Sequence, residues 1–160
     1  MNLVDLSNLH YADQCVKHPS VPDYARTRKK YSDKTANGLT TAIVDFCNLS
    51  GHFAQRTGNE GRYRPGQVVT DVIGRQRQMK GTWLPGHNNG AADVSLTMAG
   101  RIYFIEVKIG KDRQREDQVT FMNKVRNAGG VYEIVKTWEE FYRWYLHWTM
   151  KDKIKVNKIC

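Results

Sequence analysis

"AADVSLTMAGRIYFIEVKIGK", residues 91–111, decides the fold, because two runs of alternating apolar residues flank Ala99-Gly100. Such alternation around a short turn predicts a β-hairpin with one buried face. A two-residue turn sets the register, and the expected pairs are Met98–Arg101, Leu96–Tyr103 and Val94–Ile105. In that register Asp93 lies opposite Glu106, where like charges destabilise a hairpin. The pattern therefore predicts a compensating cation at this end.

The same register sorts the side chains onto two faces of the hairpin. One face is apolar and carries Val94, Leu96, Tyr103, Ile105 and Val107. The other face carries Ile102 and Phe104 and ends in both acids with Lys108. An odd-length turn would instead separate the two carboxylates across the sheet. Acids and a lysine at strand ends usually form a surface ion-pair ladder, but the apolar residues leading into Glu106 favour a catalytic site.

Two close carboxylates suit Mg²⁺ or Mn²⁺, which prefer oxygen ligands and retain several waters. The backbone carbonyl of Val107 is an expected extra ligand. A bound divalent ion can activate a water for attack on a phosphodiester, and a neighbouring lysine can orient that water. Asp93, Glu106 and Lys108 are therefore the expected centre of the chemistry.

Length and composition indicate one folded domain. The chain has 160 residues, and 40% of them are hydrophobic, which excludes a disordered chain. No apolar run is long enough to span a bilayer, and the first residues lack the pattern of a signal peptide, so we expect a cytoplasmic protein without a membrane partner. Three widely spaced cysteines suggest reduced thiols.

The net charge of +9 favours a polyanionic partner, with nucleic acid first among the candidates. An exposed arginine in isolation is usually only solvated, whereas several together can hold a phosphate backbone. The residues expected to bind DNA are Arg56, Arg62, Arg64, Arg75, Arg77, Lys80 and Lys111.

Periodicity along the chain predicts the remaining elements. Residues 1–34 are expected to form an irregular basic arm with one short helix, and 35–150 a single domain followed by a basic tail, 151–160. Within the domain we expect a helix at 35–49, followed by an exposed basic ribbon or loop at 52–90 that contains short strands at 52–57 and 67–73. The hairpin comes next. After it we expect a helix ending at Gly129-Gly130, the strand "VYEIV" and a helix that starts after Thr137.

This order implies an α/β fold, with a mixed central sheet and helices on both faces. The strand, helix and strand between 101 and 135 form a crossover, so the last strand pair should be parallel.

Three segments carry a resemblance to a known family: "GAADV", "FIEVKIGKDRQREDQVTF" and "AGGVYEIV". They resemble the PD-(D/E)XK nuclease superfamily, most closely its VRR-type branch of phage and bacterial replication-repair proteins. The resemblance implies a restriction-endonuclease-like core and a Mg²⁺-dependent DNA phosphodiesterase. It implies that Asp93 and Glu106 bind the metal, that Lys108 positions the attacking water and that Gln118 approaches from its helix. It also implies a homodimer that acts on branched DNA.

The chain departs from the family pattern at two places. Ala92 stands where the family often has proline, and the first helix lacks the glutamate that usually lies near the metal. The expected substitutes for that glutamate are Asn37 as a neutral ligand, or else Asp33 or Asp45.

The leading hypothesis is an endonuclease that hydrolyses phosphodiester bonds, selective for branched or junction DNA in replication or repair. The alternative is a nucleic-acid-binding module that retains the nuclease fold without catalysis. A third hypothesis is a small interaction protein whose positive charge is incidental.

Overall fold

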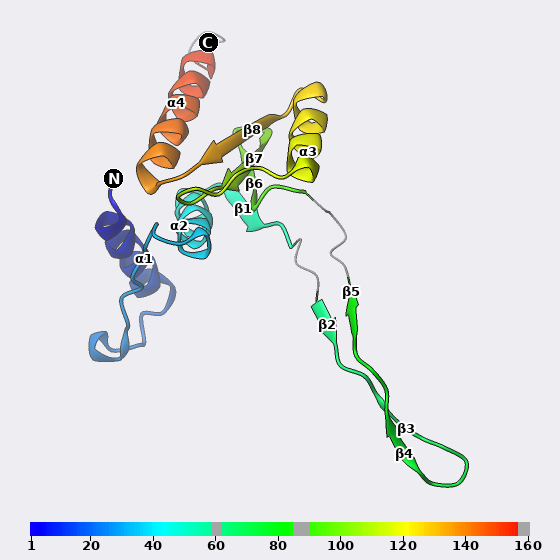
Figure 1. Ribbon diagram of the computed structural model, residues 1–160. Coiled ribbons are helices and arrows are strands. Elements are labelled where there is room, and N and C mark those ends of the chain that lie inside the picture. The colour runs from blue at the N-terminus through cyan, green and yellow to red at the C-terminus, as the bar shows by residue number, and fades with distance from the viewer. Residues whose placement is uncertain (59–61, 85–89, 157–160) are drawn as a thin grey trace.

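The computed structural model describes the backbone of residues 1–58, 62–84 and 90–156 (Figure 1). Side chains are described in the same ranges up to Met150, except that of Arg62.

The hairpin at the centre of the fold has the predicted register. β6 (Val94–Met98) pairs antiparallel with β7 (Arg101–Val107), and Val94 lies opposite Ile105. Ala99 and Gly100 have φ angles of 49° and 72°, as a type I′ turn of two residues requires. The even-length turn is confirmed.

The hairpin forms the middle of a four-stranded mixed sheet in the order β1-β6-β7-β8. β1 (Phe53–Arg56) pairs antiparallel with β6, and β8 (Val131–Val135) pairs parallel with β7. The parallel pair is joined by α3 (Glu116–Asn127), as a crossover requires. The predictions of a mixed sheet and of a parallel last pair are confirmed.

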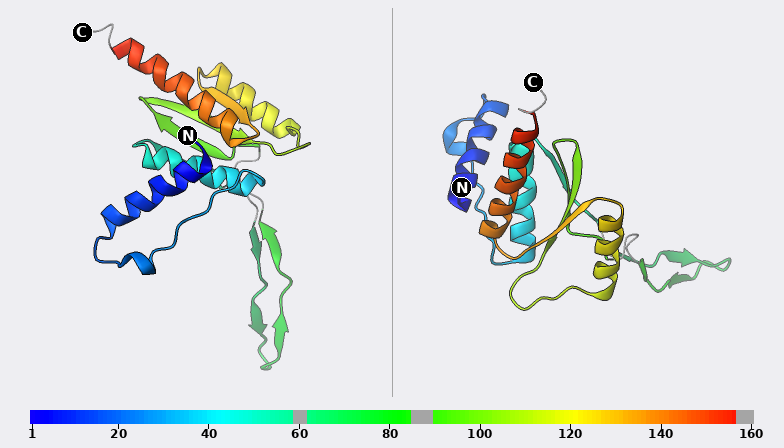
Figure 2. Two further views of the ribbon diagram at one scale, coloured as in Figure 1. Left: turned by 90° about the vertical axis from the view of Figure 1, so that its left-hand side faces the viewer. Right: turned by 90° about the horizontal axis from the view of Figure 1, so that it is seen from above.

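Helices cover both faces of this sheet, as predicted (Figure 2). α2 (Ala36–Leu49) and α4 (Trp138–Val156) pack on one face, where they enclose the larger core. That core is formed mainly by Leu39, Ile43, Phe46, Leu96, Tyr103, Ile105 and Phe141. α3 covers the other face through a smaller cluster around Ala92, Val125 and Tyr132. The apolar face expected of the hairpin is therefore the one that packs on α2.

The N-terminal segment is more ordered than the expected irregular arm. It contains α1 (Leu3–Lys17), which packs on α2, and the 3₁₀-helix η1 (Asp23–Ala25). Asn2 and Asp5 form a capping box that starts α1, and Leu6 is fully buried. Among the described side chains of this helix, Leu6 is the one that is buried, so the apolar periodicity of the helix is weak. The sequence therefore gives little indication of how long α1 is.

α4 continues to Val156 through most of the segment expected as a tail, and 157–160 lie outside the described residues. None of the helices in the described ranges combines the length and hydropathy needed to cross a membrane.

Between β1 and β6 the chain extends away from the core as a long two-stranded arm (Figure 1). β2 (Arg62–Arg64) pairs with β5 (Thr82–Leu84), and β3 (Val68–Thr70) pairs with β4 (Gln76–Gln78). The exposed ribbon expected here is confirmed. The strand expected at 67–73 ends at Thr70, because the chain reverses at Asp71–Gly74.

Candidate active site

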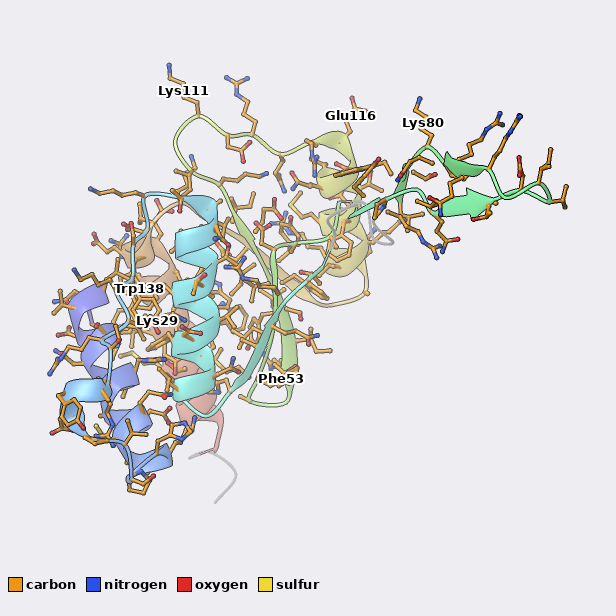
Figure 3. All side chains as sticks on the ribbon, turned by 90° about the horizontal axis from the view of Figure 1, so that it is seen from below. Lys29, Phe53, Lys80, Lys111, Glu116 and Trp138 are labelled. Atoms are coloured by element: carbon orange, nitrogen blue, oxygen red, sulfur yellow. The ribbon has the colours of Figure 1, made fainter. Side chains whose placement is uncertain are left out.

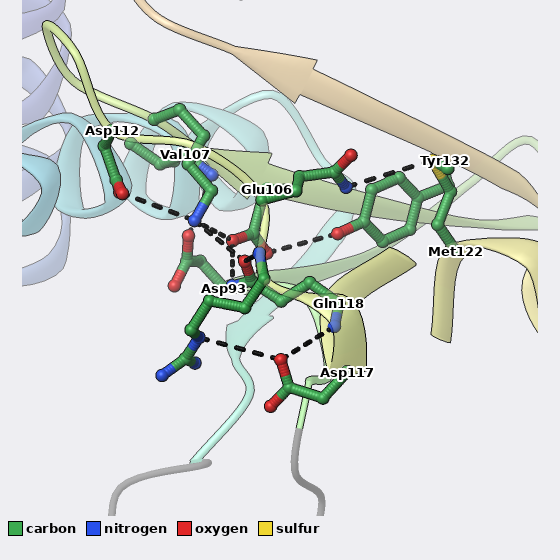
Figure 4. A network of polar contacts seen from close by, with 11 residues as sticks. Asp93, Glu106, Val107, Asp112, Asp117, Gln118, Met122 and Tyr132 are labelled. Carbon is green, nitrogen blue, oxygen red and sulfur yellow. Dashed lines mark hydrogen bonds and ion pairs between the residues drawn. The ribbon is translucent and has the colours of Figure 1, made fainter. Parts of the chain in front are cut away.

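The two acids of the hairpin lie on the same side of the sheet, facing α3 (Figure 4). Glu106 lies near the end of β7 and is only 1% exposed, whereas Asp93 directly precedes β6 and is half-buried. Asp93 is held in place because its Oδ2 accepts a hydrogen bond of 2.8 Å from the Val107 amide. The confirmed register therefore brings the two carboxylates together, as the sequence predicts.

Lys108 and Gln118 complete a buried polar cluster with Glu106. Lys108 Nζ lies 3.0 Å from Glu106 Oε1 and donates a 2.9 Å hydrogen bond to Gln118 Oε1. The Gln118 side-chain amide donates in turn to Glu106 Oε1. Both Lys108 and Gln118 are 6% exposed. Gln118 can reach the site because it lies in the first turn of α3, where its Oε1 also accepts from the Arg115 amide at 3.0 Å.

Two further residues belong to this cluster, and the sequence analysis did not identify them. Tyr132 on β8 donates its hydroxyl hydrogen to Glu106 Oε2 at 3.3 Å, and Asp112 Oδ2 lies 3.4 Å from Lys108 Nζ. The alternation of "VYEIV" in a strand parallel to β7 places Tyr132 on the face of Glu106, and this pattern was the available signal. Asp112 lies in a loop, so no periodicity marks it.

The electrostatics of the cluster indicate an excess of negative charge. Burial and the nearby Asp93 carboxylate raise the pKa of Glu106, against the opposing effects of Lys108 and Tyr132. Burial disfavours the charged form of Lys108, but Glu106 and Asp112 together raise its pKa. Burial and the charge of Glu106 raise the pKa of Tyr132, so this hydroxyl stays protonated as a donor at neutral pH. One lysine thus incompletely compensates for the acids around it.

A cavity of about 480 Å³ opens beside Asp93, which is the member of the acid pair that lines it. Its lining is Ala36, Asn37, Thr40, Arg56, Thr57, Gly58 and Asp93. Arg56 spans from β1 to the start of α2, where it donates to Asn37 Oδ1 at 2.5 Å and to Thr41 Oγ1 at 2.5 Å. These contacts fix a guanidinium group in the wall of the cavity that Asp93 also lines.

The expected substitutes for a helix glutamate each have a protein partner in this structure, and their role as metal ligands stays a prediction. Asn37 lies at the cavity, but its side-chain oxygen already accepts from the Arg56 cation. Asp33 accepts from the Trp138 amide at 3.2 Å, and Asp45 binds Lys29 at 2.5 Å on the far side of α2. Neither of these acids contacts the cluster around Glu106, because each is committed to the packing of the N-terminal segment.

The candidate metal ligands are the carboxylates of Asp93 and Glu106, and both Glu106 oxygens already accept hydrogen bonds from Gln118 and Tyr132. In the ranges that the structure describes, three or more acidic, histidine or cysteine side chains nowhere gather as a metal-binding group. Asp93 and Glu106 supply two carboxylates, and a Mg²⁺ ion bound through one or two carboxylates with several waters needs no more. Val107 donates its amide hydrogen to Asp93 Oδ2, and the role expected of its carbonyl as a metal ligand stays a prediction.

The predicted DNA-binding residues lie at two places outside the cluster. Arg64, Arg75, Arg77 and Lys80 are exposed along the arm, and Lys111 is exposed on the loop before α3 (Figure 3). The side chain of Arg62 lies outside the described part of the chain. Arg56 differs from the rest because its side chain is bound to α2 next to Asp93.

No family model and no curated protein matches this chain.

Proposed function

We propose that this protein is a metal-dependent DNA endonuclease with a restriction-endonuclease-like core. The observation that carries the proposal is the buried cluster of Glu106, Lys108 and Gln118 beside Asp93. A buried ion pair adds little stability compared with apolar packing, and a carboxylate placed next to a second carboxylate is unfavourable. A buried cluster of this kind, next to a cavity that Asp93 lines, is typical of a functional site.

The order of elements supports the same proposal. Without the arm, the chain runs α2, β1, β6, β7, α3 and β8, with the acids at the end of the central hairpin. This order is what the resemblance of residues 90–118 to VRR-type nucleases leads one to expect. Fold alone does not supply function, so the proposal rests on the site.

In the proposed reaction each residue has a defined role. Asp93 and Glu106 would hold Mg²⁺ or Mn²⁺, which supplies an activated water and polarises a phosphoryl oxygen when bound. The Lys108 ammonium group orients the attacking water and stabilises the negative charge that develops on the phosphoryl oxygens. Gln118 is a positioning residue, because it bonds both Lys108 Nζ and Glu106.

Arg56 is suited to hold the phosphate that enters the cavity. Its guanidinium is fixed by Asn37 and Thr41, so little side-chain freedom is lost when it binds an anion. In this role Arg56 supplies positive charge at the position where other members of the superfamily have an acid on the first helix. Asn37 then acts as a positioning residue for Arg56 and not as a metal ligand.

A second function is favoured by that same neutral Asn37. A nucleic-acid-binding module would keep the fold and the basic arm without cleaving DNA. It predicts salt-sensitive binding and no metal-dependent nicking.

Two cleavage assays, each with Mg²⁺ or EDTA, distinguish the two functions. One measures nicking of supercoiled plasmid, and the other measures cleavage of linear, flapped and four-way-junction DNA. We expect Mg²⁺-dependent cleavage products from the wild type. The cleavage rate should fall at least about 100-fold in Glu106→Gln and in Lys108→Met, because each substitution removes a group that acts on the reacting atoms. Glu139→Gln is the matched control, since Glu139 is an exposed acid on α4. Full activity of Glu106→Gln would contradict the nuclease assignment, and binding without cleavage by the wild type would favour the second function.

A further inference from the structure

The described residues of the arm between β1 and β6 form no buried apolar core, since those from 63 to 84 are exposed or half-buried. Its strands pair with one another and, in the described ranges, with no strand of the central sheet. A two-stranded ribbon is at best marginally stable by itself in water, so an arm of this length is best explained by a partner. The apolar side chains that it exposes are Tyr63, Val68, Val69, Val72, Ile73, Met79 and Trp83.

The charge of the arm indicates what kind of partner it binds. Residues 62–84 contain five basic residues, Arg62, Arg64, Arg75, Arg77 and Lys80, and one acid, Asp71. Asp71 is already used by the arm itself, because its Oδ1 accepts from the Ile73 and Arg75 amides at 3.0 and 2.8 Å. The charge available to a partner is therefore almost entirely positive, which complements a nucleic acid backbone.

The tip of the arm presents two apolar side chains on a fixed turn. Gly74 has a φ of 79° and donates to the Asp71 carbonyl at 3.0 Å, and the Asp71 amide donates to the Arg75 carbonyl at 2.9 Å. Turn positions usually carry polar residues or glycine, yet Val72 and Ile73 stand here with exposures of 106% and 75%. Apolar side chains at the end of a basic element are the chemistry by which some DNA-binding proteins unstack a base step.

The dimensions of the arm match a DNA groove. A two-stranded ribbon fits the major groove, and apolar wedges between base steps are used by proteins that bind the minor groove. From Arg62 to the tip the ribbon is about 35 Å long at about 3.3 Å per residue, close to one turn of B-DNA. Its length is thus enough to follow a groove for a full turn.

The arm is attached next to the candidate active site. The Thr57 amide, where the arm leaves β1, donates to the Asp93 carbonyl at 3.0 Å. On the returning side Gly90 has a φ of 81°, and a Cβ there would lie 2.3 Å from the Asp117 carbonyl oxygen, so the chain passes tightly against α3. Both ends of the arm are therefore fixed within a few residues of Asp93.

We propose that the arm lies in a groove of duplex DNA and that Val72 and Ile73 insert between neighbouring base pairs, so that the duplex is bent or opened near the site. This inference rests on the proposed function only in taking DNA as the substrate. It deepens that function by naming the substrate class: duplexes that unstack readily, such as those beside a junction or flap. The energy of unstacking makes such DNA the preferred partner.

The experiment uses the full chain in EDTA, so that no cleavage is needed for a result. A duplex of about 30 base pairs, with 2-aminopurine at its centre and a dye at each end, reports unstacking by fluorescence and bending by energy transfer. The variants are V72S/I73S at the tip and R75Q/R77Q on the strand. The matched control is V68S/V69S, which replaces exposed apolar residues away from the tip.

We expect the wild type to increase 2-aminopurine fluorescence and to shorten the end-to-end distance. V72S/I73S should lose both signals while its affinity falls less than about tenfold, because the phosphate contacts remain. R75Q/R77Q should bind at least about tenfold more weakly and lower the salt slope of log K by about two. V68S/V69S should behave as the wild type.

Unchanged 2-aminopurine fluorescence with the wild type, or equal signals from V72S/I73S and the wild type, would overturn the proposal. So would conversion of a dimer to a monomer by V72S/I73S with DNA bending unaffected, because the tip would then bind a second copy of the chain. A protein that unstacks DNA here but fails to nick plasmid with Mg²⁺ would contradict the proposed nuclease and leave this inference standing.

Discussion

Replacing Asp93 by asparagine should stabilise the protein in the absence of divalent ions. The substitution keeps a side-chain oxygen that can accept from the Val107 amide and removes one of two facing negative charges. Two unit charges about 5 Å apart, at an effective dielectric constant of about 20, repel by about 3 kcal/mol. Part of this gain is cancelled, because the Val107 amide bonds a neutral amide oxygen less strongly than a carboxylate oxygen. We therefore expect Asp93→Asn to raise the free energy of unfolding by about 1–2 kcal/mol in EDTA.

Saturating Mg²⁺ should reverse this order. An ion that binds the native state at 100 times its Kd adds about 2.7 kcal/mol to the free energy of unfolding. The wild type should gain this amount, whereas Asp93→Asn, with one carboxylate fewer, should gain much less. The two urea unfolding curves should therefore exchange places between EDTA and Mg²⁺.

Urea unfolding followed by tryptophan fluorescence measures both conditions. Asp112→Asn is the matched control, because Asp112 also lies near Lys108 but is mostly exposed. It should change stability by less than about 0.5 kcal/mol in EDTA and keep the full response to Mg²⁺. If Asp93→Asn is less stable than the wild type in EDTA, or if Mg²⁺ stabilises both equally, then the two acids do not share an ion.

Three other properties of the fold can be tested. Leu6→Ala should lower the free energy of unfolding by about 2–5 kcal/mol, because Leu6 is fully buried between α1 and α2. Val4→Ala should lower it little, because Val4 is exposed. Equal effects of the two substitutions in calorimetry would mean that α1 does not pack on α2. Ala99→Asn should stabilise by about 0.5–1 kcal/mol in urea unfolding, because asparagine tolerates the positive φ of 49° better than alanine, and a loss of stability would contradict the type I′ turn. Burial lowers the pKa of His52, so below about pH 6.5 the unfolded chain binds a proton that the folded protein binds less readily. The free energy of unfolding of the wild type should therefore fall relative to that of His52→Gln between pH 7.5 and 5.5, and parallel pH profiles would contradict this assignment.

The sheet and the acid pair were predictable because their signals are local. Alternation with period two fixes which face each residue of 94–107 occupies, and a two-residue turn fixes the register. The position of Gln118 near the acids was predicted from a family resemblance. The partners of Asn37 could be identified only from the three-dimensional structure. Arg56 reaches Asn37 from a different element, and no periodicity in a sequence encodes such a contact.

The length of the N-terminal helix and the end of the strand at 67–73 were missed for a different reason. α1 buries one residue deeply, so its apolar pattern is weak, and its start depends on the side-chain cap at Asn2. In the arm, the turn at Asp71 is formed by hydrogen bonds that two backbone amides donate to a single carboxylate. Both features depend on one polar residue, and averaging over a window of sequence hides them.

The insertion of the arm between two adjacent strands also affects how the chain folds. β1 and β6 are hydrogen-bonded neighbours, yet residues 57–93 separate them. Closing that loop costs about 2 kcal/mol more than closing one of about five residues. The strand pair that fixes Asp93 should therefore form late, after the local hairpin of β6 and β7. Because the arm begins and ends at neighbouring positions, evolution could lengthen, shorten or replace it without disturbing the order of the sheet. Under the proposed function, such changes would alter which nucleic acid is recognised while the chemistry stays the same.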